Sequence, residues 1–293
     1  MYTDEKSSPP VTPLDDEERA SPPAPIPAEQ VHLRPTLERS LTWPAWVEVA
    51  KALVIWVASF MLLLFIPVIV ALPYLLYRLL SGGAPSAQAI AGDKGLLFFS
   101  VLGIWPAHLL TLAVAWLIVS EGGRRPFWKI IGFEWPEGVS PMTTTLASVF
   151  AGLALFGMAW LVTFLYGEKK TDLDILIESS TYTRVAMAFM ATATAPLVEE
   201  VIYRGVLYRA LEKAAGIAVA IPIVSLLFAG VHVYQYRNNI AVILVITLLS
   251  IVLTVSRAVT GKLLPAFIIH LVFNGIQSVF IVLAGFVDSE MLK

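Results

Sequence analysis

The stretch Glu199-Glu200-Val201-Ile202-Tyr203-Arg204 places two carboxylates and a guanidinium inside an otherwise apolar part of the chain. A charged side chain near the centre of a bilayer costs at least about 2.5–3.5 kcal/mol on insertion scales. Such groups are retained either as an ion-pair cluster that fixes helix packing or as part of a functional site. Because one arginine balances one glutamate and not two, a functional site is favoured.

Helical spacing separates the roles of the two glutamates. Glu200 and Arg204 stand four residues apart, so they share a helix face and can form an ion pair. Glu199 points about 100° away from Glu200, because an α-helix has 3.6 residues per turn, and this face carries no cation to pair with it. A carboxylate of this kind beside a histidine is a candidate general base for water.

Two later apolar segments bring histidines to the same depth. If the chain turns near Gly216, Glu199 and His232 lie roughly 20 and 24 Å from that turn at about 1.5 Å rise per residue. The last segment enters from the same side near Leu264, six residues before His270. The sequence therefore predicts one polar pocket shared by three helices. This hypothesis requires Glu199 to lie within about 10 Å of an imidazole, since a bridging water cannot span more.

His270 and Asn274 also stand four residues apart. One helix face thus presents two hydrogen-bond donors to a common point, which is what stabilisation of an oxyanion requires. The alternative for this pair is polar contact between helices. A further histidine, His108, follows Pro106 in another apolar segment and is interpreted as a partner for a carbonyl that the proline frees.

Composition places the chain in a membrane. Hydrophobic residues make up 57% of the 293 residues and charged residues 14%, whereas soluble domains average about 45–50% and 25%. The expected fold class is all-α, a polytopic membrane protein. The net charge of −2 gives no reason to expect nucleic-acid binding. The absence of cysteine excludes disulfides, thiolate metal sites and cysteine nucleophiles.

The chain divides into a tail and a helical domain. Residues 1–45 are rich in proline, serine and acidic residues and predict a disordered tail. Residues 46–290 are expected to form the transmembrane helical domain, and residues 183–286 its catalytic core. Because a spanning helix needs about 20 mostly apolar residues, seven spans are expected, or eight if the first is broken at Pro67 and Pro73. The lysines and arginines near the span ends favour an N-terminus in the cytoplasm. The seven expected spans are 47–77, 95–119, 143–166, 183–212, 217–235, 239–257 and 264–286.

Three motifs in this order resemble those of a known family. They are Glu-Glu-x-x-x-Arg at 199–204, Phe-x-x-x-His from Phe228 to His232, and His-x-x-x-Asn from His270 to Asn274. The set resembles the type II CaaX prenyl endopeptidase-like family, also called the CPBP or bacteriocin-processing intramembrane proteases. The resemblance covers about residues 183–286. It implies an all-helical membrane fold that hydrolyses peptide bonds at a site open to the cytoplasm and the bilayer.

The resemblance also implies roles for individual residues. Glu199 and His232 would activate the attacking water, and His270 with Asn274 would stabilise the tetrahedral oxyanion. Glu200 would belong to the same catalytic group, and Arg204 and Phe228 would support it. The expected partners are a peptide or protein substrate, reached from the membrane or the cytoplasm, and the lipid bilayer. The short, loop-poor chain points to the inner membrane of a bacterium.

Several alternatives stay open at this point. Metal-free catalysis is favoured, because asparagine and a paired arginine suit oxyanion and structural roles better than ligation. The alternative is a zinc ion held by Glu199, His232 and His270, with water in the open position. Two other functions are a non-proteolytic membrane adaptor or bacteriocin self-immunity protein that retains the pocket, and a proton-coupled transporter. The sequence shows no internal repeat of the kind that transporters carry.

Overall fold

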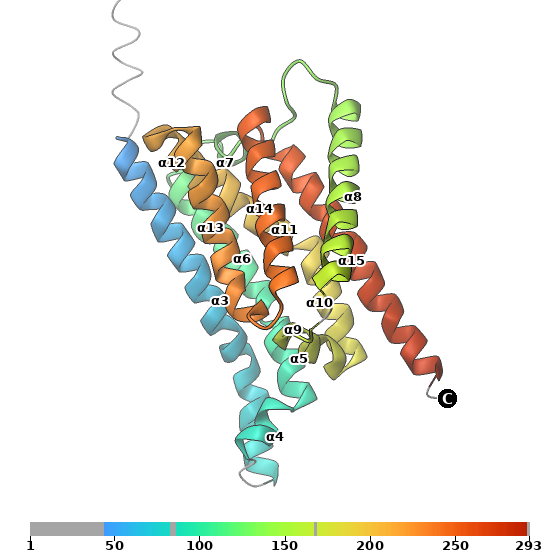
Figure 1. Ribbon diagram of the computed structural model, residues 1–293. Coiled ribbons are helices and arrows are strands. Elements are labelled where there is room, and N and C mark those ends of the chain that lie inside the picture. The colour runs from blue at the N-terminus through green and yellow to red at the C-terminus, as the bar shows by residue number, and fades with distance from the viewer. Residues whose placement is uncertain (1–43, 83–85, 167–168, 292–293) are drawn as a thin grey trace, which may run out of the picture. The chain divides into compact units, whose positions relative to one another are not determined.

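The computed structural model describes residues 44–82, 86–166 and 169–291, and every regular element within them is a helix (Figure 1). The all-α prediction is confirmed for this part of the chain. The expected tail at 1–45 lies outside the described residues, except that Ala45 begins the first described helix, α3.

Six helical stretches are long and apolar enough to cross a membrane, by length and composition. They coincide closely with six of the seven spans expected from the sequence, and they make the chain an integral membrane protein. The stretches are Ala45–Gly82 (α3), Lys94–Val119 (α5 and α6), Pro141–Tyr166 (α8), Thr181–Ala215 (α10 to α12), Ile240–Thr260 (α14) and Leu264–Gly285 within α15.

The seventh expected span, 217–235, corresponds to α13 (Ile217–Tyr236), whose apolar part is shorter than the other six. The structure therefore supports six spans by this measure, where the sequence predicted seven or eight. α13 still packs along α14 and against α12, so it belongs to the same bundle. Pro67 and Pro73 lie inside α3 without ending it, so the break that would have produced an eighth span is absent from this helix.

The span expected at 95–119 is an interrupted helix. It consists of α5 (Lys94–Leu102) and α6 (Ile104–Val119), which meet at Gly103. A Cβ at Gly103 would stand 2.5 Å from the Cα of Pro67. Glycine at this position therefore lets the interrupted helix approach the backbone of α3 closely.

The span expected at 183–212 is divided into four segments, so the prediction of one regular helix is wrong. Pro196 has no amide hydrogen and cannot complete the α-helical pattern of the preceding turn. The α-helix accordingly stops at Ala193, and Thr194 separates it from the next segment. The segments are α10 (Thr181–Ala193), α11 (Ala195–Glu199), the π-helix η1 (Glu200–Tyr208) and α12 (Arg209–Ala215).

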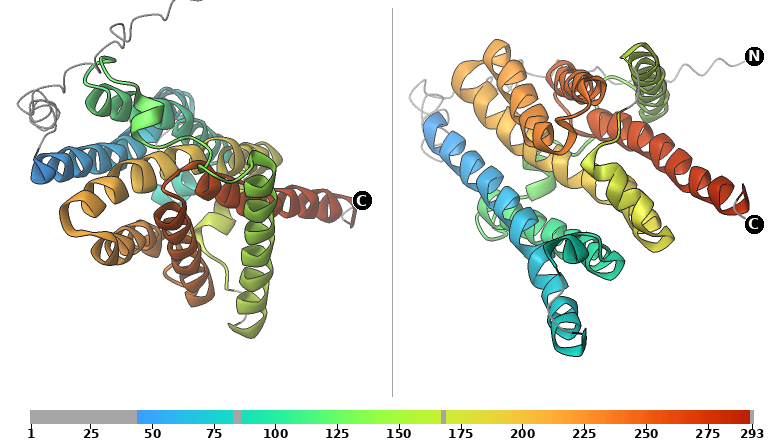
Figure 2. Two further views of the ribbon diagram at one scale, coloured as in Figure 1. Left: turned by 90° about the horizontal axis from the view of Figure 1, so that it is seen from above. Right: turned by 60° about the horizontal axis from the view of Figure 1, so that its bottom comes forward.

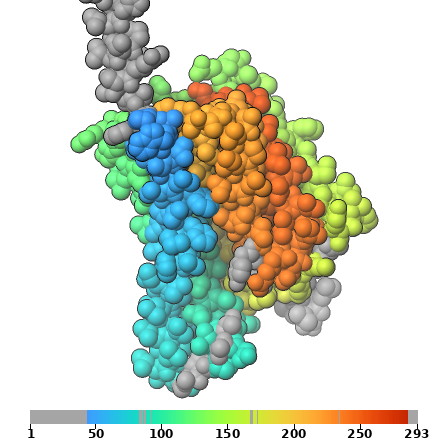
Figure 3. All heavy atoms as spheres, turned by 60° about the vertical axis from the view of Figure 1, so that its left-hand side comes forward, coloured from blue at the N-terminus to red at the C-terminus, as the bar shows by residue number. Residues whose placement is uncertain are grey.

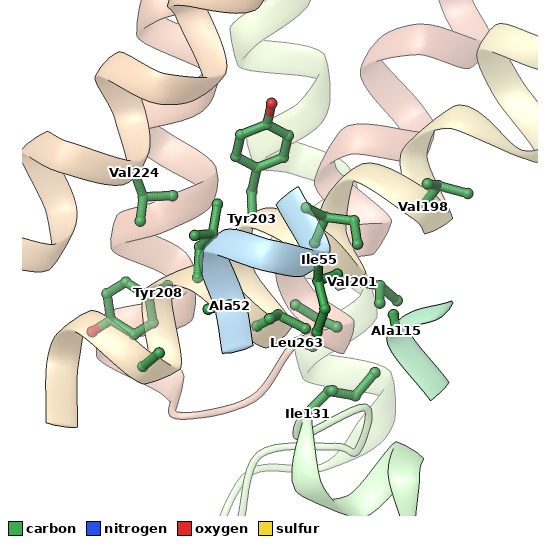
Figure 4. Packing of buried hydrophobic residues seen from close by; sticks show 14 of the residues in the cluster. Ala52, Ile55, Ala115, Ile131, Val198, Val201, Tyr203, Tyr208, Val224 and Leu263 are labelled. Atoms are coloured by element: carbon green, nitrogen blue, oxygen red, sulfur yellow. The ribbon is translucent and has the colours of Figure 1, made fainter. Parts of the chain in front are cut away.

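The π-helix η1 lies in the main apolar core. All nine of its residues are buried. Its apolar side chains pack with Ala52 and Ile55 of α3 and with Val224 of α13, around Val201 and Tyr203 (Figure 4). The charged residues of η1 are therefore held in a part of the bundle that is closed to lipid and to bulk water.

α15 (Leu264–Met291) packs against α8 and α10 on another side of the bundle (Figures 1 and 2). Leu155 of α8, Leu253 of α14 and Ile269 of α15 belong to a second apolar cluster that joins these helices. This packing fixes the rotation of α15 and so directs His270 and Asn274 away from α8. Three short helices complete the described elements: α4 (Ala87–Ala91), α7 (Phe127–Ile130) and α9 (Asp172–Ser179).

Candidate active site

The charged motif lies where α11 changes into η1. Glu199 is the last residue of α11 and Glu200 the first of η1. π-helical turns are rare and occur frequently at functional sites, where they redirect side chains. The change of helix type was not predicted from the sequence, although Pro196 gave a signal that the preceding helix would be broken.

Arg204 is the anchor of the site and is fully buried. Its Nη1 donates to Glu200 Oε1 at 3.0 Å, as the spacing of four residues predicted. Its other nitrogens donate to α14. Nη2 reaches both the carbonyl and the hydroxyl of Ser250, at 3.1 and 3.0 Å, and Nε reaches Thr254 Oγ1 at 3.3 Å. Buried guanidinium is tolerated because its donors are satisfied in this way.

The two hydroxyl partners on α14 were missed from the sequence. Ser250 and Thr254 are four residues apart inside an expected span, so one helix face presents both hydroxyls. That spacing was the available signal. The ring of Phe228 completes the surroundings of Arg204, with the guanidinium carbon 4.6 Å from the ring centroid. Phe228 is 2% exposed and makes a cation–π contact with the guanidinium.

His270 joins the third helix to the same carboxylate. Its Nδ1 lies 2.9 Å from Glu200 Oε1, and both side chains are essentially buried. Because an ionised carboxylate only accepts hydrogen bonds, Nδ1 carries the hydrogen in this contact. Glu200 Oε1 therefore accepts one hydrogen bond from Arg204 Nη1 and another from His270 Nδ1. A carboxylate that holds one imidazole nitrogen fixes the direction of the other nitrogen.

That other nitrogen faces Glu199. His270 Nε2 lies 3.7 Å from Glu199 Oε2, well within the limit that the sequence hypothesis required. The separation is too long for a direct hydrogen bond. The Glu199 side chain is 25% exposed, whereas that of His270 is 2% exposed. Glu199 is thus the carboxylate of the pair that water and substrate can reach.

His232 contributes an imidazole from α13. Its Nδ1 lies 2.7 Å from the carbonyl of Phe228, so this nitrogen donates within its own helix. The ring lies 4.8 Å from that of Phe228, and the Phe228 ring lies 6.2 Å from that of His270, measured between centroids. The Phe228 ring therefore lies next to both imidazole rings. Among the described residues His232 makes no hydrogen bond to Glu199.

Asn274 has a partner that the sequence did not reveal. Its Nδ2 donates to the carbonyl of Ala191 at 2.9 Å. Ala191 lies in the last turn of α10, directly before the break at Thr194. The amide group carries two N–H donors, so one remains beyond this bond. Asn274 ties α15 to the interrupted helix that carries Glu199.

His108 also contacts the helix break. Its Nδ1 lies 2.9 Å from Thr194 Oγ1, so its partner is a hydroxyl and the predicted freed carbonyl is wrong. The break between α10 and α11 turns the Thr194 side chain toward α6 and makes this contact possible. His108, Tyr203 and Tyr236 lie within electrostatic reach of Glu199.

A zinc site would need Glu199, His232 and His270 to act as its ligands. Within the described residues, no three His, Asp or Glu side chains are arranged so that they could hold a metal ion. Zinc ligands stand about 2.0–2.2 Å from the metal and converge on one point. The Nδ1 atoms of His270 and His232 are held by Glu200 and by the Phe228 carbonyl, so Nε2 is the ring nitrogen that each could offer a metal. In the described part of the chain, Glu199, His232 and His270 do not converge as a set of metal ligands.

One part of the chain matches a known protein family. Residues 181–276 match the model of the family described as type II CAAX prenyl endopeptidase Rce1-like. This segment is a domain of that family. The matched segment contains every motif residue described above, together with Ser250 and Thr254. No curated protein and no solved structure matches the chain.

Proposed function

We propose that the protein is an intramembrane endopeptidase that hydrolyses a peptide bond with a water activated by Glu199. One observation carries the proposal. Glu199 Oε2 and His270 Nε2 face each other at 3.7 Å, while Glu200 holds the opposite nitrogen of the same ring. A partly exposed carboxylate beside a fixed imidazole is a site at which water can be deprotonated and an oxyanion stabilised.

Charge balance supports a donor role for His270. Glu199 and Glu200 carry two negative charges, and Arg204 supplies one positive charge. A protonated His270 makes the group neutral and leaves both ring nitrogens as donors. Nδ1–H donates to Glu200, and Nε2–H is directed toward the place where an oxyanion would form. The remaining N–H of Asn274 is the second donor that the sequence suggested.

Glu199 and His232 together activate the attacking water. Because the Nδ1–H of His232 is used by its own backbone, Nε2 of the neutral ring is an acceptor. A water that donates one hydrogen to Glu199 and the other to His232 is oriented for attack. Glu199 takes the proton as the oxygen adds to the scissile carbonyl. The same proton then passes to the leaving amine when the C–N bond breaks.

The substrate is proposed to be a peptide or a membrane protein segment, reached from the bilayer or the cytoplasm. Counted over the seven spans expected from the sequence, the distribution of lysine and arginine supports a cytoplasmic N-terminus, and the short, loop-poor chain supports a bacterial inner membrane. Neither feature identifies a cleavage sequence, so substrate discovery is the direct test of the proposal.

Comparative peptidomics of membranes from cells that produce wild-type protein or Glu199→Ala provides that test. We expect a set of peptides to depend on the wild-type protein and to vanish in the variant. Glu137→Gln is the matched control, because Glu137 is an exposed loop carboxylate with 91% side-chain exposure. Identical peptide sets in wild-type and Glu199→Ala cells contradict the proposal. Complementation of a deletion strain by Glu199→Gln favours an adaptor or immunity protein instead.

A further inference from the structure

A cleft separate from the motif residues lies where α3, α6, α7 and α12 meet. The space between its lining side chains, open solvent at the mouth included, is about 400 Å³. Three cationic side chains line it, from three different parts of the chain: Lys51 of α3, Arg125 of the segment between α6 and α7, and Arg209 of α12. Glu48 is the one carboxylate among the lining residues. The lining residues sum to +2 (three cations minus one carboxylate), and Glu121, which pairs with Arg125, brings the cluster to +1.

The two arginines of the cleft are only weakly neutralised. Arg209 Nη1 stands 3.9 Å from Glu48 Oε2, at the limit of an ion pair. Arg125 pairs with Glu121 at 3.2 Å, and both side chains are about a third exposed or more. Exposed pairs of this kind contribute little and exchange readily with other anions. The cleft can therefore accept an anionic group from outside.

The rest of the lining is aliphatic. Ala52, Ile55, Ile118 and Val119 form the apolar half. Beside the cleft, the outer face of α3 exposes Leu53, Val54 and Val57 by 45, 58 and 48% (Figure 3 shows α3 from this side). A ligand that fits this surface has an anionic end for the cations and an apolar chain that lies along α3.

Two tryptophans indicate the level of the cleft in the membrane. Trp46 at the start of α3 is 72% exposed, and Trp128 in α7 is 49% exposed. Tryptophan gathers at the boundary between hydrocarbon and headgroups. Glu48 and Lys51 follow Trp46 within two helical turns, so the cations stand at headgroup level. Basic pockets between transmembrane helices at this level bind phospholipid headgroups.

We infer that this cleft binds the phosphate headgroup of an anionic phospholipid, with Lys51, Arg125 and Arg209 around the phosphate and an acyl chain along α3. The apolar half of the lining favours a lipid over free phosphate. Gly205 and Val206 of η1 also line the cleft. A bound headgroup would therefore hold α3 and α12 together over the helix that carries Glu200 and Arg204.

Native mass spectrometry of the intact purified protein tests the inference. The protein is exchanged into nanodiscs that contain equal amounts of phosphatidylglycerol and phosphatidylcholine, and the lipid that stays bound is measured. We expect wild-type protein to retain phosphatidylglycerol. Each cation removed in Lys51→Gln/Arg209→Gln should lower retention about fivefold, since one basic residue near an anionic surface contributes about 1 kcal/mol. The double variant should therefore lose about 25-fold.

Two control variants make the test specific. Arg124→Gln removes the same charge from an exposed neighbour that does not line the cleft, and it should retain the lipid as wild-type does. Glu48→Gln removes the competing carboxylate and should raise retention. Glu48→Gln is expected to increase lipid retention, and a misfolded protein would not do so. This result therefore tests the inference even if the double variant fails to fold.

Several outcomes overturn the inference. Equal retention of the two lipids by wild-type protein excludes an anionic headgroup site. Equal loss in Arg124→Gln shows that only overall charge matters. Displacement of the lipid by millimolar glycerophosphate or inorganic phosphate shows that the cleft is a site for free phosphate.

Discussion

Replacing Arg204 by methionine should destabilise the protein severely, because it leaves the buried carboxylate of Glu200 without a cation. Arg204 and Glu200 are both fully buried and lie 3.0 Å apart. Removing one partner of a buried pair costs about 3–5 kcal/mol. The free energy of unfolding of the purified protein in mixed micelles measures this loss. Arg78→Met is the matched control, since Arg78 pairs with Asp93 at a surface site with 52% exposure and should cost less than about 1 kcal/mol.

The double variant Glu200→Gln/Arg204→Met should recover most of that stability. It removes both charges, and a neutral pair of similar volume is often as stable as the ion pair it replaces. On α14 the Ser250 carbonyl still accepts from Thr254 Oγ1 at 2.7 Å, whereas the buried Ser250 hydroxyl loses its bond from Arg204 Nη2. The substituted glutamine still accepts from His270, but its neutral amide no longer stabilises a protonated ring. We therefore expect cleavage to stay about 10²–10⁴-fold below wild type.

This pair of variants separates packing from chemistry. If the double variant is no more stable than Arg204→Met, the buried charge of Glu200 is not what Arg204 neutralises. If the double variant cleaves at the wild-type rate, the ionised carboxylate of Glu200 has no part in the reaction. Either result refutes the reasoning from the 3.0 and 2.9 Å contacts to Glu200 Oε1.

Three other contacts lead to further predictions. His232→Ala should lower cleavage about 100-fold or more with little change in unfolding, because the ring is half-buried at the end of α13; an unchanged rate removes it from water activation. Asn274→Ala should cost about 1 kcal/mol of stability through the lost bond to Ala191, measured by denaturation; no change means that this bond is not formed. The hydrogen bond between Lys262 and Glu134 lowers the pKa of Glu134 and raises that of Lys262. Its contribution, taken as the stability difference from Lys262→Met, should shrink progressively as the pH falls below about 4.3, the ordinary pKa of glutamate, and vanish only below the lowered pKa of Glu134. A difference that does not shrink at all as the pH falls contradicts this prediction.

The sequence predicted the convergence of the motif helices because depth in a membrane can be counted along a helix. A rise of about 1.5 Å per residue placed Glu199 and His270 at similar depth, and the structure brings them to 3.7 Å. The pairing of Glu200 with Arg204 followed in the same way from a spacing of four residues. Both arguments need only local geometry, which the π-helical turn alters too little to separate the partners.

The rotation of each helix about its axis and the positions of helix breaks could not be predicted by counting residues along the helices. The depth argument gives no rotation about the helix axis, so it could not show that His270 meets both glutamates while Nδ1 of His232 bonds to its own helix. The partners of Arg204 on α14 depend on how two helices pack, and packing is decided by the whole core. The bond from Asn274 to Ala191 exists because the helix is interrupted at Thr194. Pro196 predicts an interruption, but the sequence does not say which side chain will satisfy the carbonyl next to it.

The most direct test of the account is the rate at which the purified, reconstituted protein cleaves a substrate, for wild type, Glu199→Gln and the loop control Glu137→Gln. Glutamine preserves the volume of Glu199 but cannot take a proton from water. The account predicts that Glu137→Gln cleaves as wild type does and that Glu199→Gln loses at least about 100-fold in single-turnover rate. It also predicts that Glu199→Gln unfolds as wild type does. A correctly folded Glu199→Gln protein with the wild-type rate would contradict the account.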